Sequence, residues 1–371
     1  MQRELLKSKL PPGLPTPNDR TGLALKRRRD YSQVSWENYF DSCQDVNVGE
    51  NSIFRIYKSG SSGPVLLLLH GGGFSALSWS LFTAKVTLLS NCQVVAVDCR
   101  GHGDTRTLND LDLSIETLTD DVRCLVETLY PEDSPEIILI GHSMGGAVAV
   151  HTAAKCLIPS LIGLVVIDVV EGTALEGLSV MQSFLKGRPK SFNSIEKAIE
   201  WSVRSGQIRN LESARVSMPG QLMKCTIESG GQSESSSKIG SSGLYVISEA
   251  SEKSSDKSDD NEASEERYEY QWKINLSETD KYWEGWFKDM SRLFLSCPVP
   301  KLLLVAGRDR LDKELTVAHI QGKFQLHLLP KCGHAVHEDD PEKVAEMLTM
   351  FMARHKFAEL KQSCQSYMPC C

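Results

Sequence analysis

The chain has 371 residues, of which 41% are hydrophobic and 24% charged, as is typical of a soluble globular protein with a sizeable core. No apolar run reaches the roughly 18 residues that span a bilayer, and the N-terminus lacks the apolar segment of a signal peptide, so we expect a cytoplasmic protein without a membrane partner. The formal net charge of -7 comes mostly from residues 225–268, where ten acidic and four basic residues give -6, and we expect no nucleic-acid partner.

Residues 1–30 are basic, carry prolines and show no periodicity, so they are predicted to form a disordered arm. The cluster Lys26-Arg27-Arg28-Arg29 is a candidate nuclear-localisation signal, although short basic tracts often match by chance. A nuclear location in addition to the cytoplasm therefore stays open.

The first part of the predicted core, residues 31–170, alternates apolar strands with helices. Helices are predicted at residues 78–89 and 117–130, and strands at residues 53–57, 65–69, 93–98 and 161–170. This alternation indicates a mostly parallel sheet with helices on both faces. His102 lies in the corner sequence D-C-R-G-H-G that follows the third of these strands, and we expect it to be structural rather than catalytic.

Residues 136–146 read E-I-I-L-I-G-H-S-M-G-G, and the rest of the chain is organised around them. The aliphatic run predicts a strand buried on both faces, and the small residues after the run predict a close-packed helix. The G-x-S-x-G sequence between strand and helix is the pattern of the nucleophile elbow of the α/β-hydrolase fold. Glycines on both sides relieve the crowding of this sharp turn, so Ser143 is the candidate nucleophile.

An oxyanion hole is predicted from two backbone segments. The strand at residues 65–69 runs into His70-Gly71-Gly72-Gly73, and an H-G-G-G sequence in esterases supplies one backbone N–H donor. Gly72 and Gly73 are the candidates for that donor. The second donor is the N–H of Met144, directly after the nucleophile.

The strand–helix pattern stops over residues 171–300, which we interpret as a helical cap. Amphipathic helices are predicted at residues 192–205 and 282–295, and the tryptophans of the second could line a substrate pocket or belong to the core. Residues 225–268 between these helices are rich in Ser, Glu, Asp and Lys, and they are predicted to be a disordered loop because they could bury little apolar surface.

The core resumes at residues 301–358, with strands predicted at 301–306 and 324–329. His334 follows the second strand in a Gly-His loop, before a helix that Pro341 starts, and it is the candidate catalytic histidine; His337 is its competitor. Residues 359–371 are predicted to be a flexible tail. Its final Cys370-Cys371 pair suits an unmodified end better than a prenylated one, since nothing else indicates a GTPase.

Five segments together resemble the protein phosphatase methylesterase family. They are residues 141–146 (G-H-S-M-G-G), 167–173 (I-D-V-V-E-G-T), 205–218 (S-G-Q-I-R-N-L-E-S-A-R-V-S-M), 294–298 (F-L-S-C-P) and 332–339 (C-G-H-A-V-H-E-D). The resemblance implies a serine hydrolase that removes the methyl ester from the C-terminal leucine of the type 2A protein phosphatase catalytic subunit, which would be both substrate and partner. It also implies that Asp168 is the triad acid, whereas the habit of the wider superfamily favours Asp309.

Two other functions stay open from the sequence. A general carboxylesterase or lipase would use the same triad on small esters, and a non-catalytic phosphatase-binding scaffold would keep only the fold. All triad positions are filled, which favours an enzyme. Ester hydrolysis by a serine triad needs no metal or organic cofactor, so we expect none, and nothing in the sequence demands more than a monomer.

Overall fold

The computed structural model describes residues 29–227, 267–307 and 311–361. The chain divides into two units, Met1–Asp30 and Tyr31–Cys371, and the fold below is that of the second. Several predictions fall outside the described residues: those on the basic arm up to Arg28, on Asp309, on Cys370 and Cys371, and on most of the acidic segment.

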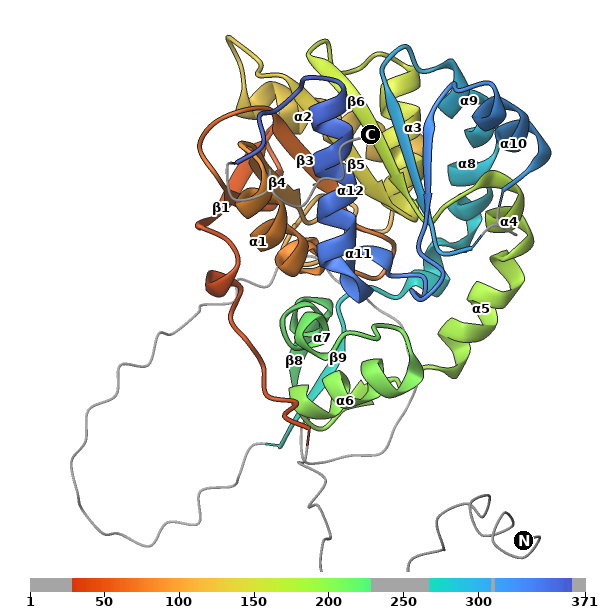
Figure 1. Cartoon of the computed structure of the whole chain (residues 1–371). Helices are drawn as coiled ribbons and strands as arrows, with labels where there is room; N and C mark the ends of the chain where they lie inside the picture. Colours follow the sequence, from red (N-terminus) through yellow and green to blue (C-terminus); the bar gives the residue numbers. More distant parts are fainter. Residues whose placement is uncertain (1–28, 228–266, 308–310, 362–371) are drawn as a thin grey trace, which may run out of the picture. The chain divides into compact units, whose positions relative to one another are not determined.

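An eight-stranded sheet forms the centre of the unit (Figure 1). Its strands, in spatial order, are β1 (Ser42–Val48), β2 (Ser52–Ser59), β4 (Gln93–Val97), β3 (Val65–Leu69), β5 (Ile137–His142), β6 (Leu161–Ile167), β10 (Lys301–Val305) and β11 (Gln325–Leu328). The pairs β1–β2 and β2–β4 are antiparallel and the others parallel. The predicted α/β-hydrolase architecture is confirmed, with β1 as a strand that was not predicted.

Helices cover both faces of the sheet, because its central strands are apolar on both sides. Along β3, Leu67 and Leu69 pack in one hydrophobic cluster and Leu66 and Leu68 in another. The first cluster includes residues of α2 (Ile115–Leu129), α3 (Met144–Ala154), α8 (Trp283–Phe287), α9 (Met290–Ser296) and α10 (Lys313–Ile320). The second includes α1 (Ser80–Leu89), α11 (Val336–Asp339) and α12 (Pro341–Arg354), and α12 starts at Pro341 as predicted.

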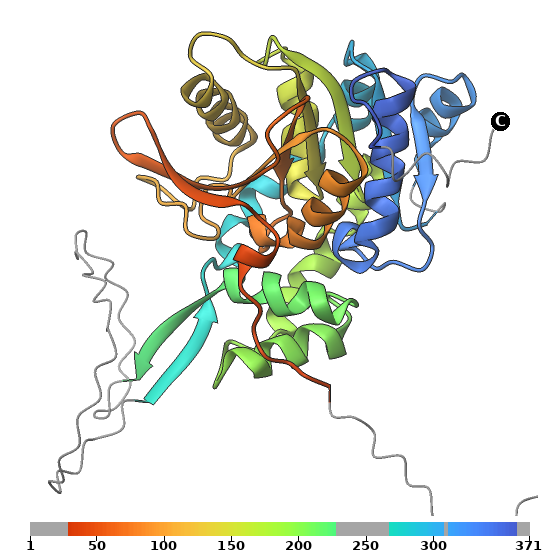
Figure 2. The same ribbon diagram turned by 60° about the vertical axis from the view of Figure 1, so that its left-hand side comes forward.

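The cap is built from helices and a small sheet. Its helices are α4 (Glu171–Glu176), α5 (Leu178–Gly187), α6 (Ile195–Ser205) and α7 (Leu211–Ser217), and its strands are β7 (Ser191–Phe192), β8 (Leu222–Ile227) and β9 (Arg267–Trp272). Figure 2 shows β8 and β9 standing out from these helices as an antiparallel pair. Residues 225–227 and 267–268, which were predicted to belong to the disordered loop, therefore lie in paired strands; residues 228–266 are not described.

The single helix predicted at residues 282–295 is wrong. The 3-10 helix Leu276–Tyr282 leads into α8, and α9 begins only after Asp289, whose φ of 61° is left-handed. The break is fixed from a distance, because the carboxylate of Glu171 accepts hydrogen bonds from the N–H groups of Asp289 and Ser291, each at 3.0 Å.

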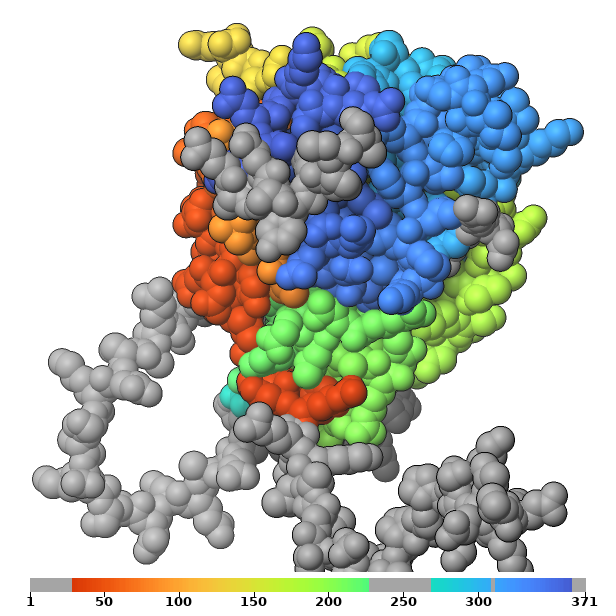
Figure 3. All heavy atoms as spheres, in the orientation of Figure 1, coloured from red at the N-terminus to blue at the C-terminus, as the bar shows by residue number. Residues whose placement is uncertain are grey.

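The cap is joined to the core beside the C-terminal helices. In Figure 3 the green part of the cap adjoins the blue C-terminal part of the core. The N–H of Arg209 donates to Asp339 at 2.7 Å, and the Ser217 hydroxyl donates to buried Glu338 at 2.6 Å. Burial raises the pKa of Glu338 to about 8. None of the described helices has both the length and the apolar character to cross a membrane.

Candidate active site

Ser143 occupies a sharp turn between β5 and α3. Its φ of 52° and ψ of -118° are unfavourable for a residue with a side chain, and its N–H donates to the carbonyl of Ile167 at 3.0 Å. A Cβ on Gly141 would collide with the carbonyl of Gly145, and one on Gly145 would collide with that of Leu69. The two glycines therefore allow the strained turn that the sequence predicted.

His334 and Asp168 complete a hydrogen-bonded series with Ser143. His334 Nε2 lies 3.0 Å from Ser143 Oγ, and His334 Nδ1 lies 2.9 Å from Asp168 Oδ2. Because a carboxylate only accepts, Nδ1 carries a proton and Nε2 is left to accept the serine proton. The series therefore has the geometry of a nucleophile, a general base and an orienting acid.

Asp168 is held rigidly at the end of β6. Its side chain is fully buried, its φ is 52°, and its second carboxylate oxygen accepts from the N–H of Ala306 at 2.8 Å. Its own N–H donates to the carbonyl of Leu304 at 2.7 Å, so the ends of β6 and β10 fix it together. The structure thus brings Asp168, the acid that the family resemblance implied, to His334; Asp309 lies outside the described residues.

His337, the competing histidine, is buried away from the nucleophile. Its ring centroid lies 4.1 Å from that of Trp79 and 4.6 Å from that of His142. Burial lowers the pKa of His337 to about 3, which keeps the ring neutral. It contributes to the packing behind the site.

His142 supports the histidine loop. The carbonyl of His334 can only accept, so His142 Nε2 carries a proton and donates to it at 2.9 Å. Burial, with smaller contributions from His337 and His334, holds the pKa of His142 well below its ordinary value. A neutral His142 therefore lies under the triad and fixes the backbone of His334.

Of the two candidate oxyanion donors in the glycine loop after β3, only Gly72 has an N–H group that the described residues leave free. The N–H of Gly73 donates to His102 Nε2 at 2.9 Å, so the prediction of Gly73 as a donor is corrected. The N–H groups of Gly72 and Met144 have no protein acceptor among the described residues, and both residues line the same cavity as Ser143. These two amides fit an oxyanion hole.

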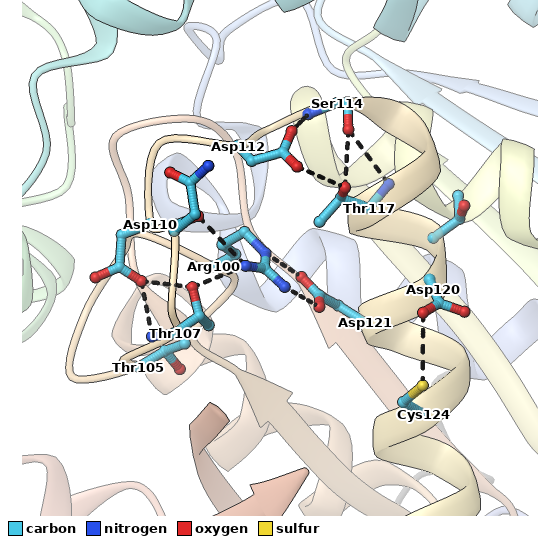
Figure 4. Close-up of polar contacts among 12 residues, drawn as sticks. Arg100, Thr105, Thr107, Asp110, Asp112, Ser114, Thr117, Asp120, Asp121 and Cys124 are labelled. Carbon is cyan, nitrogen blue, oxygen red and sulfur yellow. Dashed lines mark hydrogen bonds and ion pairs between the residues drawn. The ribbon is translucent and has the colours of Figure 1, made fainter. Parts of the chain in front are cut away.

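The corner that contains His102 anchors this loop. His102 Nδ1 donates to the carbonyl of Arg100 at 2.8 Å, and burial lowers the pKa of His102 to about 4, so Nε2 is free to accept from Gly73. Figure 4 shows Arg100 clamped by both oxygens of Asp121, at 2.6 and 2.8 Å, and by the Thr107 hydroxyl. His102 is structural, as expected, but its role is to position the loop.

A cavity of about 650 Å³ opens beside Ser143 and His334. Its walls are mostly apolar and come from the glycine loop, the cap helices α4 and α5, the core helix α8, and the 3-10 helix before α8. Trp283 and Trp286 line it while being almost fully buried, so they belong to both the core and the pocket. Phe184 of α5 also lines it and is 46% exposed, which places an apolar side chain between the cavity and solvent.

Comparison with known proteins assigns the chain to a family. Residues 66–347 match the alpha/beta hydrolase family. Protein phosphatase methylesterase 1 of Bos taurus is 56% identical over 339 residues, which cover 90% of this chain and 89% of that protein. The Mus musculus protein of the same name is 54% identical over 351 residues, covering 93% and 91%. This chain belongs to the protein phosphatase methylesterase family.

Likeness within the family extends to distant animals. The probable protein phosphatase methylesterase 1 of Caenorhabditis elegans is 41% identical over 369 residues, covering 99% of this chain and 90% of that protein. Among solved structures, E-2-(acetamidomethylene)succinate hydrolase shares the fold with a TM-score of 0.62 at 18% identity, covering 84% of this chain and 99% of that one. The protein is therefore a hydrolase of the methylesterase family.

No group of three or more His, Cys, Asp or Glu side chains that could hold a metal ion occurs among the described residues.

The site of this methylesterase contains two residues whose contribution the sequence did not indicate, His142 and Arg188. In the sequence, His142 is only the variable position before the serine of G-x-S-x-G. Its hydrogen bond to the carbonyl of His334 joins residues 192 positions apart, so no local pattern indicates it. The half-buried Arg188 lines the cavity, but it lies in a segment of apolar and polar residues that matches no known motif.

Proposed function

We propose that this methylesterase hydrolyses the methyl ester on the C-terminal leucine of the type 2A protein phosphatase catalytic subunit, using Ser143, His334 and Asp168. The observation that carries the proposal is the unbroken series of hydrogen bonds from Asp168 through His334 to Ser143. The names of the relatives support a phosphatase as the substrate.

The first half of the reaction forms an acyl-enzyme. Ser143 Oγ attacks the ester carbonyl while His334 Nε2 takes its proton, and Asp168 stabilises the resulting imidazolium. The tetrahedral oxyanion accepts hydrogen bonds from the N–H groups of Gly72 and Met144, and losing one such donor typically costs about 100- to 1,000-fold in rate. His334 then returns the proton to the leaving oxygen, and methanol departs.

The second half repeats these steps with water. His334 removes a proton from a water molecule, which attacks the acyl-serine carbonyl, and the collapse of the intermediate returns the proton to Ser143. The products are methanol and a free carboxylate. The hydrogen bonds from Asp168 through His334 to Ser143 support this sequence of steps, in which the only reactant besides the substrate is water.

The cavity suits a leucine methyl ester. An esterified C-terminus carries no charge, and its leucine side chain is apolar, so both would be favoured by the apolar walls next to Ser143. The exposed Phe184 offers a further apolar contact to a protein surface that approaches the cavity.

The test measures methanol release from the methylated catalytic subunit by the wild type and by Ser143→Ala. We expect the wild type to release methanol from the subunit and Ser143→Ala to release none. Cleavage of small acyl esters without demethylation of the subunit would identify a general carboxylesterase. Binding of the subunit without release of methanol would identify a non-catalytic scaffold.

A further inference from the structure

Arg188 directly follows α5 and lines the same cavity as Ser143 and His334. Its guanidinium carbon lies 4.2 Å from the centre of the Trp272 ring, and its Nη2 donates a long hydrogen bond to the carbonyl of Ile274 at 3.4 Å. These contacts leave most of its five N–H donors unused.

The charge of Arg188 has no partner among the described residues. The other described arginines that are not exposed are each paired with a carboxylate: Arg55 with Asp45, Arg100 with Asp121, Arg123 with Asp120, and Arg215 with Glu212. Burial lowers the pKa of Arg188 to about 10, which still leaves it protonated at neutral pH. A partly buried cation without an anion is costly to maintain, which suggests that a ligand supplies the anion.

The guanidinium of Arg188 stacks on Trp272, an indole that is itself fixed by its neighbours. Trp272 donates from its indole nitrogen to the carbonyl of Pro189 at 2.7 Å. The rings of Phe192 and Trp201 each lie 5.6 Å from Trp272 in edge-to-face contact. Stacking on a fixed indole fixes the plane of the guanidinium, so little conformational entropy is lost when an anion binds.

We propose that Arg188 binds a carboxylate side chain of the peptide substrate, an Asp or Glu on the N-terminal side of the esterified residue. The inference rests on the proposed function, because an esterified terminus has no carboxylate of its own and the anion must then come from a side chain. Arg188 is also the only Lys or Arg among the described residues that line the cavity, which suits one carboxylate better than a doubly charged phosphate.

The test compares peptides that end in leucine methyl ester and differ only in one acidic residue, Asp or Glu, replaced by Asn or Gln. Each pair places the acid at one of the successive positions before the leucine. Binding is measured by fluorescence anisotropy with full-length Ser143→Ala, which cannot form the acyl-enzyme, so affinity is read without turnover. The same measurement is made after adding Arg188→Met, Arg188→Lys or Arg204→Met to this background. Arg204 is an exposed cap arginine that does not line the cavity. Arg204→Met is therefore the control that removes the same charge at a distance from the site.

The acidic peptide is expected to bind about 10- to 100-fold more tightly than its amide partner at one position. Arg188→Met should abolish this preference, Arg188→Lys should retain part of it, and Arg204→Met should leave it intact. No preference at any position, a preference that survives Arg188→Met, or no binding of any peptide would overturn the inference. Methanol release from the same peptides by the wild type reports separately on the proposed function, and the Arg188→Lys result stands if Arg188→Met does not fold.

Discussion

The hydrogen bond from Gly73 to His102 offers a sharp test of how the oxyanion loop is positioned. In His102→Phe a ring of similar size fills the buried site, but Gly73 loses its acceptor and the Arg100 carbonyl loses its donor. Both hydrogen bonds are only partly buried, so each loss should cost about 1 kcal/mol, and the free energy of unfolding should fall by about 2 kcal/mol in total.

The effect on catalysis distinguishes positioning from mere stabilisation. A displaced Gly72 amide would stabilise the transition state less, so kcat on a small ester should fall about 10- to 100-fold while KM changes little. Steady-state kinetics and urea unfolding of the wild type and variant measure the two effects. Thr107→Val, which removes one partner of Arg100 but leaves His102 in place, is the matched control. A variant that loses stability but keeps kcat within twofold would refute the positioning role of His102.

Two further predictions concern buried carboxyl groups. Asp168→Asn should keep the hydrogen bond from the Ala306 N–H but stabilise the wrong tautomer of His334, so kcat should fall by about 10⁴-fold. If kcat fell less than tenfold in this variant but strongly in Asp309→Asn, the role of the triad acid would move to Asp309. Glu338 has a pKa raised from 4.5 to about 8, so the folded state keeps a proton that the unfolded state releases, and this contribution to stability is lost as pH rises through that range. The stability of the wild type relative to Glu338→Gln should therefore fall by about 1.4 kcal/mol per pH unit between pH 5 and 8 in urea unfolding, and equal pH dependences of the two proteins would contradict the buried, protonated state.

The central fold could be predicted because its signals are local. Strands such as β3 and β5 are continuous aliphatic runs, and their burial on both faces leaves one interpretation. The edge strand β1, S-C-Q-D-V-N-V, was missed because one buried side chain out of seven gives no usable pattern. The break before α9 was missed because the carboxylate that fixes it belongs to Glu171, more than a hundred residues earlier.

The site residues also differ in whether a local sequence pattern predicts them. Ser143 and His334, which the structure joins by a hydrogen bond, could be proposed from the sequence because the G-x-S-x-G turn and the Gly-His loop are local patterns. Asp168 was reached by family resemblance, since the residues themselves left two carboxylates open. The role of Gly73 could not be predicted, because its N–H is taken by a histidine 29 residues further on whose neutral form depends on burial.

The most direct test of the central claim is covalent labelling of Ser143. A fluorophosphonate reacts with an activated serine, and mass spectrometry of the digested protein locates the label while methanol release from the methylated phosphatase subunit is followed in parallel. We predict a single label on Ser143, with activity falling in proportion to the labelled fraction and much slower labelling of Asp168→Asn. Full labelling of Ser143 with methanol release unchanged would contradict the claim that this serine, activated by His334 and Asp168, performs the reaction.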